Sequence, residues 1–209
     1  VIISGNGSNL QALIDACHNK NYPARIAIVI SDNPSAYGIK RAKVAGLKAI
    51  IIDRQKYSDD GAFEKEITSV IRTVKADLIC LAGFMRLFSP NFVTQWKNQI
   101  INIHPSLLPA FKGLDVHARV LNTGTKFSGC TVHFVRPRAD DGPIILQAAV
   151  PILPNDDVST LSKRILKQEH IIYPKAVRWI AENRIHLEKD RVVLENSRED
   201  PTPIINPSD

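Results

Sequence analysis

The chain has 209 residues, of which 44% are hydrophobic and 23% are charged, and its formal net charge is +6. This composition is typical of a globular protein, and a single α/β domain often reaches this length. No apolar run approaches the roughly 20 residues that span a bilayer, which argues against a membrane protein. The basic residues are scattered and aromatic residues are few. A phosphate-bearing small molecule therefore explains the charge better than a nucleic-acid groove does.

Three cysteines, Cys17, Cys80 and Cys130, lie far apart in the sequence among apolar or small residues. Their spacing fits neither a disulfide framework nor a metal site. We therefore expect free thiols, no bound metal, and a cytoplasmic protein.

Short apolar runs alternate with helical patterns in the first half of the chain. Four β-branched runs are bounded by polar residues or glycines: 25–31, 47–53, 77–83 and 99–104. Runs that are apolar on both faces indicate a parallel sheet that is covered on both sides. Three segments between them have apolar residues near helical spacing: 8–20, 35–46 and 59–75. This alternation predicts a Rossmann-like, mostly parallel open sheet with helices on both faces.

The pattern changes after residue 104. Residues 129–135 and 143–152 predict two strands that pair antiparallel at one edge of the sheet. A helical pattern covers 158–184, and Pro174 is predicted to interrupt and kink it. Residues 184–195 predict a small hairpin that turns at Lys189-Asp190. The polar, proline-rich tail, 196–209, is expected to be loose or pinned at few points.

A glycine-containing loop, SGNGSNLQAL at 4–13, follows the first predicted strand and opens the first helix. Gly5 and Gly7 allow a tight turn and the close approach of a ligand. Ser8 or Asn9 can cap the helix and leave backbone amides pointing at an anion. The loop lacks the third glycine and the following acid of the dinucleotide fingerprint, which argues against an NAD site. The residues alone fit a phosphate site and an ordinary strand-to-helix turn equally well.

Asn102 and His104 lie two residues apart on a predicted strand, so their side chains share one face. Ligands bind at the carboxyl ends of such strands, and here Pro105 ends the strand pairing while Pro109 restricts the following loop. An asparagine amide and an imidazole at this place could donate hydrogen bonds to a developing oxyanion. The alternative is a core histidine beside an asparagine that satisfies local backbone groups, and both interpretations stay open.

A second polar loop, ADDGP at 139–143, is most simply a turn between strands. An aspartate close to His104 would, however, favour the protonated imidazole or hold it in one tautomer. We favour Asp140 over Asp141 for this contact.

The segment AGFMRLFSP at 82–90 surrounds Arg86 with apolar side chains. It suits a slot for a flat heterocycle with one charged contact, or else an apolar entry into a helix with Arg86 in solvent. Glu169 and His170, inside the long helical pattern, are most simply explained as part of a solvated helix face.

Five segments of this chain occur in the order SGNGSNLQAL, LAGFMRLFSP, NIHPSLLPAFKG, DDGPIILQ and QEHIIYP. Together they resemble the phosphoribosylglycinamide formyltransferase family, folate-dependent enzymes of purine synthesis, from residue 1 to about 190. The resemblance implies one formyltransferase domain over 1–195, with a substrate-phosphate half at 1–104 and a folate and catalytic half at 105–195. Residues 196–209 would form a polar tail.

The resemblance also implies a mechanism. The amine of glycinamide ribonucleotide would attack the formyl carbon of 10-formyltetrahydrofolate directly, with no covalent enzyme intermediate and no metal. Asn102 and a protonated His104 would stabilise the tetrahedral oxyanion. Asp140 would pair with His104 and assist the removal of a proton from the attacking amine.

Further site residues are carried over only at matching positions. The substrate would contact Gly7, Ser8, Asn9, Ile103, Pro105 and Glu169. The folate would contact Met85, Arg86, Leu87, Phe88, Val135 and Asp140. Leu166 stands where relatives carry a polar residue, which puts the nearby ribose contact in doubt. Asp115 also departs from the family pattern, while His117 is retained.

Three alternatives compete with this interpretation. A formyltetrahydrofolate deformylase would use water as the acceptor, and we would expect an additional amino-terminal domain and no phosphate loop. A methionyl-tRNA formyltransferase would need a further carboxy-terminal domain, for which 209 residues leave no room. A non-catalytic nucleotide-binding module would keep the loop at 7–9 without needing Asn102, His104 and Asp140 together. The prediction is thus an enzyme that binds two small molecules and neither nucleic acid nor membrane, with a homodimer left open.

Overall fold

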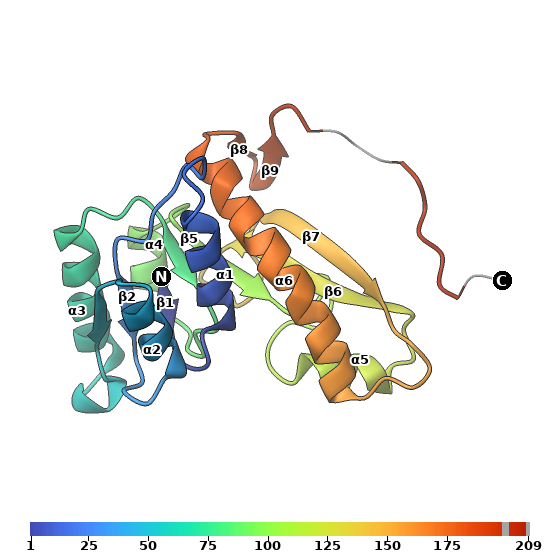
Figure 1. The fold of residues 1–209 in the computed structure, drawn as a ribbon, viewed down its shortest axis with the longest axis horizontal. Coiled ribbons are helices and arrows are strands. Elements are labelled where there is room, and N and C mark those ends of the chain that lie inside the picture. Colours follow the sequence, from blue (N-terminus) through green and yellow to red (C-terminus); the bar gives the residue numbers. More distant parts are fainter. Residues whose placement is uncertain (198–200, 208–209) are drawn as a thin grey trace.

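The computed structural model describes residues 1–197 and 201–207, and a seven-stranded sheet lies at its centre (Figure 1). The strands are β1 (Ile2–Ile3), β2 (Val29–Ser31), β3 (Ala49–Ile51), β4 (Ile79–Leu81), β5 (Ile100–His104), β6 (Phe127–Phe134) and β7 (Ile144–Pro151). Their order across the sheet is β3-β2-β1-β4-β5-β6-β7. The first five run parallel, whereas β6 pairs antiparallel with both β5 and β7. The predicted fold class is confirmed.

Helices cover both faces of this sheet. They are α1 (Ser8–Cys17), α2 (Tyr37–Val44), the 3₁₀ turn η1 (Arg54–Lys56), α3 (Asp60–Thr73), α4 (Pro90–Gln95), α5 (Val116–Asn122) and α6 (Val158–Ala181). Buried residues of α1, α5 and α6 join one apolar core, and those of α3 and α4 join a second. In Figure 1, α1 and α6 lie side by side across one face of the sheet.

The two cores follow from the alternation of side chains along each strand. In β1, Ile3 faces the core under α1 and α6, and Ile2 faces the core under α3. In β5, Ile101 and Ile103 face the first core, and Ile100 faces the second. Strands with both faces buried are mostly apolar, which is why these runs could be recognised in the sequence.

The predicted strands and long helices all form, and five of the strands are shorter than expected. The hairpin is confirmed as β8 (Ile185–Glu188) paired with β9 (Arg191–Leu194). Its turn residues Lys189 and Asp190 both have positive φ angles, 46° and 66°, as a two-residue turn of this hand requires.

The prediction that Pro174 interrupts the long helix is wrong. Helix α6 continues through it from Val158 to Ala181. Tyr173, Ala176 and Val177 are buried in the first core on either side of the proline, so tertiary packing holds this part of the helix in place.

Asn206 ties the polar tail to the sheet. The side-chain amide of Asn206 donates hydrogen bonds to the carbonyls of Lys126 and Ile152, 2.7 and 3.3 Å away, next to the ends of β6 and β7. Residues 198–200 and 208–209 lie outside the described part of the chain. All three cysteines are free. Within residues 1–197 and 201–207, no helix is long and apolar enough to cross a membrane, and no cluster of side chains suited to a metal ion occurs.

Candidate active site

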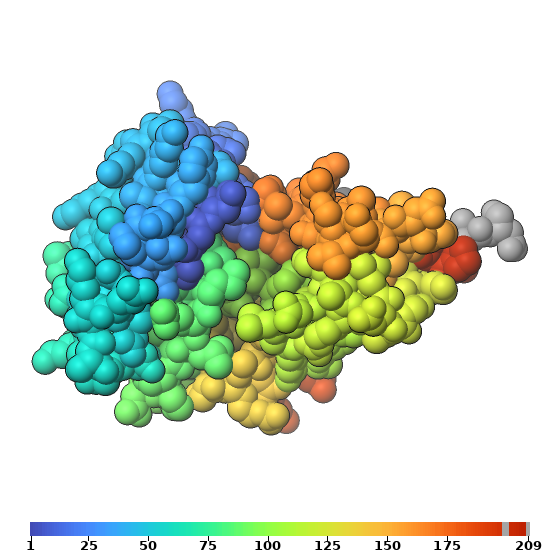
Figure 2. Space-filling model, turned by 90° about the horizontal axis from the view of Figure 1, so that it is seen from below, coloured from blue at the N-terminus to red at the C-terminus, as the bar shows by residue number. Residues whose placement is uncertain are grey.

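A cavity of about 700 Å³ lies where β4 and β5 end. The loop after β4, the segment that leads into α5, the residues after β6 and the first half of α6 surround it. Figure 2 shows this face hollowed between the green loop after β4 and the yellow-green segment before α5. All the predicted site residues except Gly7 and Ser8 line the cavity. The structure therefore brings together residues that are up to 160 positions apart in the sequence.

His104 is the last residue of β5, and only 6% of it is exposed. Its Nε2 lies 3.0 Å from the carbonyl oxygen of Phe111. Because a carbonyl oxygen only accepts, Nε2 carries a hydrogen. Its Nδ1 lies 3.5 Å from Oδ2 of Asp140, so this carboxylate offers an acceptor to a second proton on the ring.

Asp140 sits in the loop between β6 and β7 with a positive φ of 50°. Its Oδ2 also accepts a hydrogen bond of 2.9 Å from the backbone N–H of Gly113. Asp141 points elsewhere and pairs with Lys112 and, at 3.7 Å, with Arg138. Of the two adjacent aspartates, the structure thus places Asp140 beside His104, as the sequence predicted.

His133 on β6 is a site residue that sequence reasoning missed. It stands opposite Asn102 in the antiparallel pairing of β5 and β6, and it is fully buried. Burial lowers the pKa of His133, against smaller opposing effects of the Phe134 carbonyl and Asp140, and therefore favours the neutral ring. Its Nδ1 donates to the Phe134 carbonyl at 3.0 Å, which leaves Nε2 as the acceptor for the Asn102 amide at 3.4 Å. His133 thereby orients Asn102.

The glycine loop differs from the prediction in how the helix begins. Gly7 precedes α1 with φ 73°, and neither Ser8 nor Asn9 caps the helix with its side chain. Without a side-chain cap, the first amides of α1 stay available to an anion. The position needs glycine twice over, because a Cβ on Gly7 would also lie 2.7 Å from Cα of Gly38 in α2.

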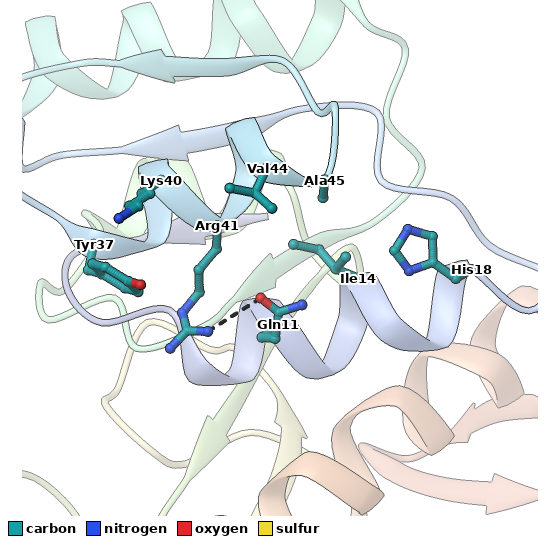
Figure 3. Close-up of a pocket in the computed structure, with 8 residues that line it drawn as sticks. All are labelled: Gln11, Ile14, His18, Tyr37, Lys40, Arg41, Val44 and Ala45. Atoms are coloured by element: carbon teal, nitrogen blue, oxygen red, sulfur yellow. Dashed lines mark hydrogen bonds between the residues drawn. The ribbon is translucent and has the colours of Figure 1, made fainter.

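Arg41 of α2 holds this loop from outside. Its Nε donates to the Asn6 carbonyl and one terminal nitrogen to Asn6 Oδ1, both at 2.9 Å. Its other terminal nitrogen reaches Oε1 of Gln11 in α1, 3.3 Å away, across a separate hollow of about 320 Å³ (Figure 3). None of the predicted site residues lines this second hollow.

Asn9 and Glu169 form a buried pair on the wall of the main cavity. Nδ2 of Asn9 donates to Oε2 of Glu169 at 2.7 Å. Oδ1 of Asn9 is buried, and no partner for it occurs among the residues the structure describes. Burial raises the pKa of Glu169, although the Asn9 hydrogen bond acts in the opposite direction. Glu169 therefore does not lie on a solvated helix face, which was the simpler interpretation of the sequence.

Replacing Glu169 with glutamine is expected to stabilise the free protein near neutral pH. The folded state holds the Glu169 proton more tightly than the unfolded state, whose pKa is near the ordinary value of 4.5. Stability contributed by this group is therefore complete below pH 4.5 and falls as the pH rises above it. Urea unfolding should show little difference between wild type and Glu169→Gln at about pH 4 and a more stable variant at about pH 7.5. An equal difference at both pH values would contradict the assignment.

The loop after β4 presents two kinds of side chain to the cavity. Met85 and Leu87 are largely exposed at its mouth. Phe88 is buried between Phe84 and Phe92, with ring centroids 4.8 and 4.1 Å away. Arg86 is not simply in solvent, since its Nε pairs with Asp32 at 2.9 Å.

The positions that depart from the family pattern also line the cavity. Leu166 lies one turn before Glu169 in α6. Asp115 precedes α5, and His117 has its Nδ1 buried without a partner among the described residues.

The fold and the cavity define an α/β protein with a ligand-sized cavity at the carboxyl ends of a parallel sheet. The family model described as formyl transferase matches residues 1–177. The chain belongs to the formyl transferase family, among the phosphoribosylglycinamide formyltransferases.

Two relatives and one solved structure illustrate this membership. A phosphoribosylglycinamide formyltransferase of Haemophilus influenzae is 41% identical over 195 residues, which cover 93% of this chain and 92% of that protein. The trifunctional purine biosynthetic protein adenosine-3 of Drosophila melanogaster is 48% identical over 179 residues, which cover 85% of this chain but only 13% of that protein. The structure of glycinamide ribonucleotide transformylase 1 from Symbiobacterium toebii gives a TM-score of 0.90 at 49% identity, with 92% of this chain and 91% of that chain covered.

Proposed function

We propose that this chain transfers a formyl group from 10-formyltetrahydrofolate to the amine of glycinamide ribonucleotide. The observation that carries the proposal is the meeting of Asn102, His104 and Asp140 in one cavity of a chain that is 41% identical to a phosphoribosylglycinamide formyltransferase. The cavity lies next to a glycine loop whose helix amides have no side-chain cap.

Each reactant is assigned to one part of the site. The ribonucleotide phosphate binds the amides of Gly7, Ser8 and Asn9, and its ribose lies towards Glu169. Ile103 and Pro105 contact the glycinamide arm near the end of β5. The folate ring enters the slot that Met85, Arg86, Leu87 and Phe88 form on one side of the cavity. Val135 and Asp140 form the other side.

The proposed reaction is a direct transfer. The amine nitrogen donates its electron pair to the formyl carbon, and the formyl oxygen takes up the negative charge of the tetrahedral intermediate. The Asn102 amide has two N–H groups, of which His133 accepts one, so the other can donate to that oxygen. A protonated His104 adds positive charge beside it.

Proton transfer and bond cleavage complete the reaction. Asp140 accepts a proton that the attacking amine loses, directly or through water. The bond between the formyl carbon and N10 then breaks, and N10 takes up a proton as the tetrahydrofolate leaves. No bond to the protein forms at any stage.

The proposal is tested by following the loss of 10-formyltetrahydrofolate with and without glycinamide ribonucleotide. Loss that requires the ribonucleotide, with one formyl group gained by it, is the expected result. Loss at equal rate without the ribonucleotide would make water the acceptor and the enzyme a deformylase. No loss in either case, from a folded protein, would favour a non-catalytic binding module.

Replacing Gly142 with alanine tests whether the aspartate loop must keep its place. A Cβ at this position would lie 1.7 Å from the carbonyl oxygen of Phe134, so the backbone of the loop must move. We expect kcat to fall at least about tenfold, as Asp140 shifts from His104, and stability to fall by about 1–3 kcal/mol. Gly61→Ala is the control, because Gly61 is helical and its closest contact would be a side-chain oxygen at 3.2 Å. Unchanged kcat in Gly142→Ala would show that the loop tolerates displacement.

A further inference from the structure

Asp32 directly follows β2 and is 8% exposed. In dinucleotide-binding sheets of this strand order, the acid at this place binds a ribose hydroxyl. Asp32 therefore occupies the place of the acid that the sequence pattern of the glycine loop did not reveal. Its Oδ2 accepts a hydrogen bond from Nε of Arg86 at 2.9 Å, so the carboxylate already has a partner of its own chain.

Arg86 connects this buried carboxylate to the cavity. Its side chain is 47% exposed and lines the cavity wall. Only its Nε bonds to Asp32, and neither terminal nitrogen has a hydrogen-bond acceptor among the residues the structure describes. Two free terminal nitrogens in one plane match the two oxygens of a carboxylate.

Residues 85–89, which include Arg86, bond to Ser4, Asp32 and Glu64. The N–H of Met85 donates to Oγ of Ser4 at 3.1 Å, and the N–H of Ser89 donates to the buried Glu64 at 2.5 Å. Asp32 supplies the third anchor, and it bonds to the side chain of Arg86, which lines the cavity. The first two hold the backbone, so they leave the direction of the Arg86 guanidinium open.

Burial makes the Asp32 anchor firm. Oδ1 of Asp32 is buried and has no partner within the described chain, so Arg86 is the cation that compensates this charge. Separating the pair would leave a buried charge without a counter-ion, which is costly. The guanidinium is therefore held in one direction before any ligand arrives.

We propose that Asp32 is a positioning residue that presents the terminal nitrogens of Arg86 to an anionic group of the second substrate. The inference rests on the proposed function, in which that substrate is a reduced folate whose glutamate carries the carboxylates. A pre-oriented arginine loses less side-chain freedom on binding than a mobile arginine does. In this proposal Asp32 therefore affects the affinity for the second substrate and does not affect the reacting atoms.

The test compares Asp32→Asn with wild type. The variant should raise KM for 10-formyltetrahydrofolate by about three- to tenfold with kcat and the KM for the ribonucleotide unchanged. The difference should vanish with 10-formyltetrahydropteroate, which lacks the glutamate. In an enzyme that already carries Arg86→Met, adding Asp32→Asn should leave the KM for 10-formyltetrahydrofolate unchanged. It should instead restore thermal stability that Arg86→Met has lost.

Asp60→Asn is the matched control. It removes the same kind of contact, Arg54 Nε to Asp60 Oδ1 at 2.8 Å, away from the cavity, and should leave every kinetic constant unchanged. If the enzyme turns over both substrates and Asp32→Asn leaves the KM unchanged or lowers it, the proposed role of Asp32 is wrong. The proposed function would still stand. If wild type neither binds 10-formyltetrahydrofolate in calorimetry nor turns it over, the proposed function falls and the inference falls with it.

Discussion

The His104→Ala variant is expected to fold like wild type and to lose at least about 10²–10³-fold in kcat. The imidazole stands at the end of β5 in the cavity wall, and its polar contacts are to Phe111 and Asp140 in neighbouring loops. Its loss would therefore remove the positive charge proposed to lie beside the reacting oxygen, and little from either apolar core. Single-turnover formyl transfer and thermal unfolding of the same samples measure the two effects separately.

His186→Ala provides a control for the histidine substitution. His186 lies on the hairpin, half exposed, and its Nε2 contacts Glu195 at 2.6 Å; neither residue lines the cavity. We expect unchanged turnover in this variant. Turnover close to wild type in His104→Ala, with a normal unfolding curve, would remove His104 from the catalytic group.

The second large effect is expected in Asp140→Asn, with a loss of about 10²-fold or more in kcat. The asparagine carbonyl can still accept the hydrogen bond from Gly113, so the loop should keep its shape. The negative charge beside His104 is lost, and so is the group proposed to accept the amine proton. Stopped-flow measurement of the transfer step, under saturating substrates, reports this loss directly.

The neighbouring residue offers a close control. Asp141 is also an aspartate of the same loop, but its carboxylate pairs with Lys112 and Arg138, and the Lys112 contact lowers its pKa. Asp141→Asn is expected to stay within about twofold of wild type, since partly exposed ion pairs contribute little. Equal losses in the two variants would indicate that the loop as a whole, rather than the Asp140 carboxylate, is what matters.

Much of the fold could be predicted because its strands are buried on both faces. The runs at 25–31 and 77–83 have apolar residues at most positions, and a parallel sheet covered by helices explains that pattern. Helix α5 was missed and α4 was only an alternative in the sequence analysis, because they are seven and six residues long. Two turns or fewer give too little periodicity to recognise, and at Asp115 the chain enters α5 through a positive φ of 53° that no pattern announces.

Candidate site residues at the end of a single strand could be predicted from the sequence. Contacts that depend on the register between paired strands could not. Asn102 and His104 follow from the rule that ligands bind at carboxyl ends of strands. His133 reaches Asn102 only because β6 pairs with β5 in one register. Asp32 reaches Arg86 across 54 positions of the sequence. Such contacts are set by the order and register of strands, which a single sequence does not give.

The geometry of the glycine loop was predicted only in part. The helix does begin at Ser8, but the left-handed Gly7 takes the capping position, and Asn9 bonds to Glu169 instead. Residue preference for helix caps is local, whereas the partner of Asn9 comes from α6, which is far away in the sequence.

The measurement that tests the central claim most directly is the initial rate of formyl transfer with both substrates varied. In the proposed reaction both reactants occupy one cavity, and the formyl group passes between them without a bond to the protein. This reaction should give intersecting double-reciprocal lines and no formylated protein after mixing with 10-formyltetrahydrofolate alone. Parallel lines, together with a protein that gains one formyl group, would contradict it.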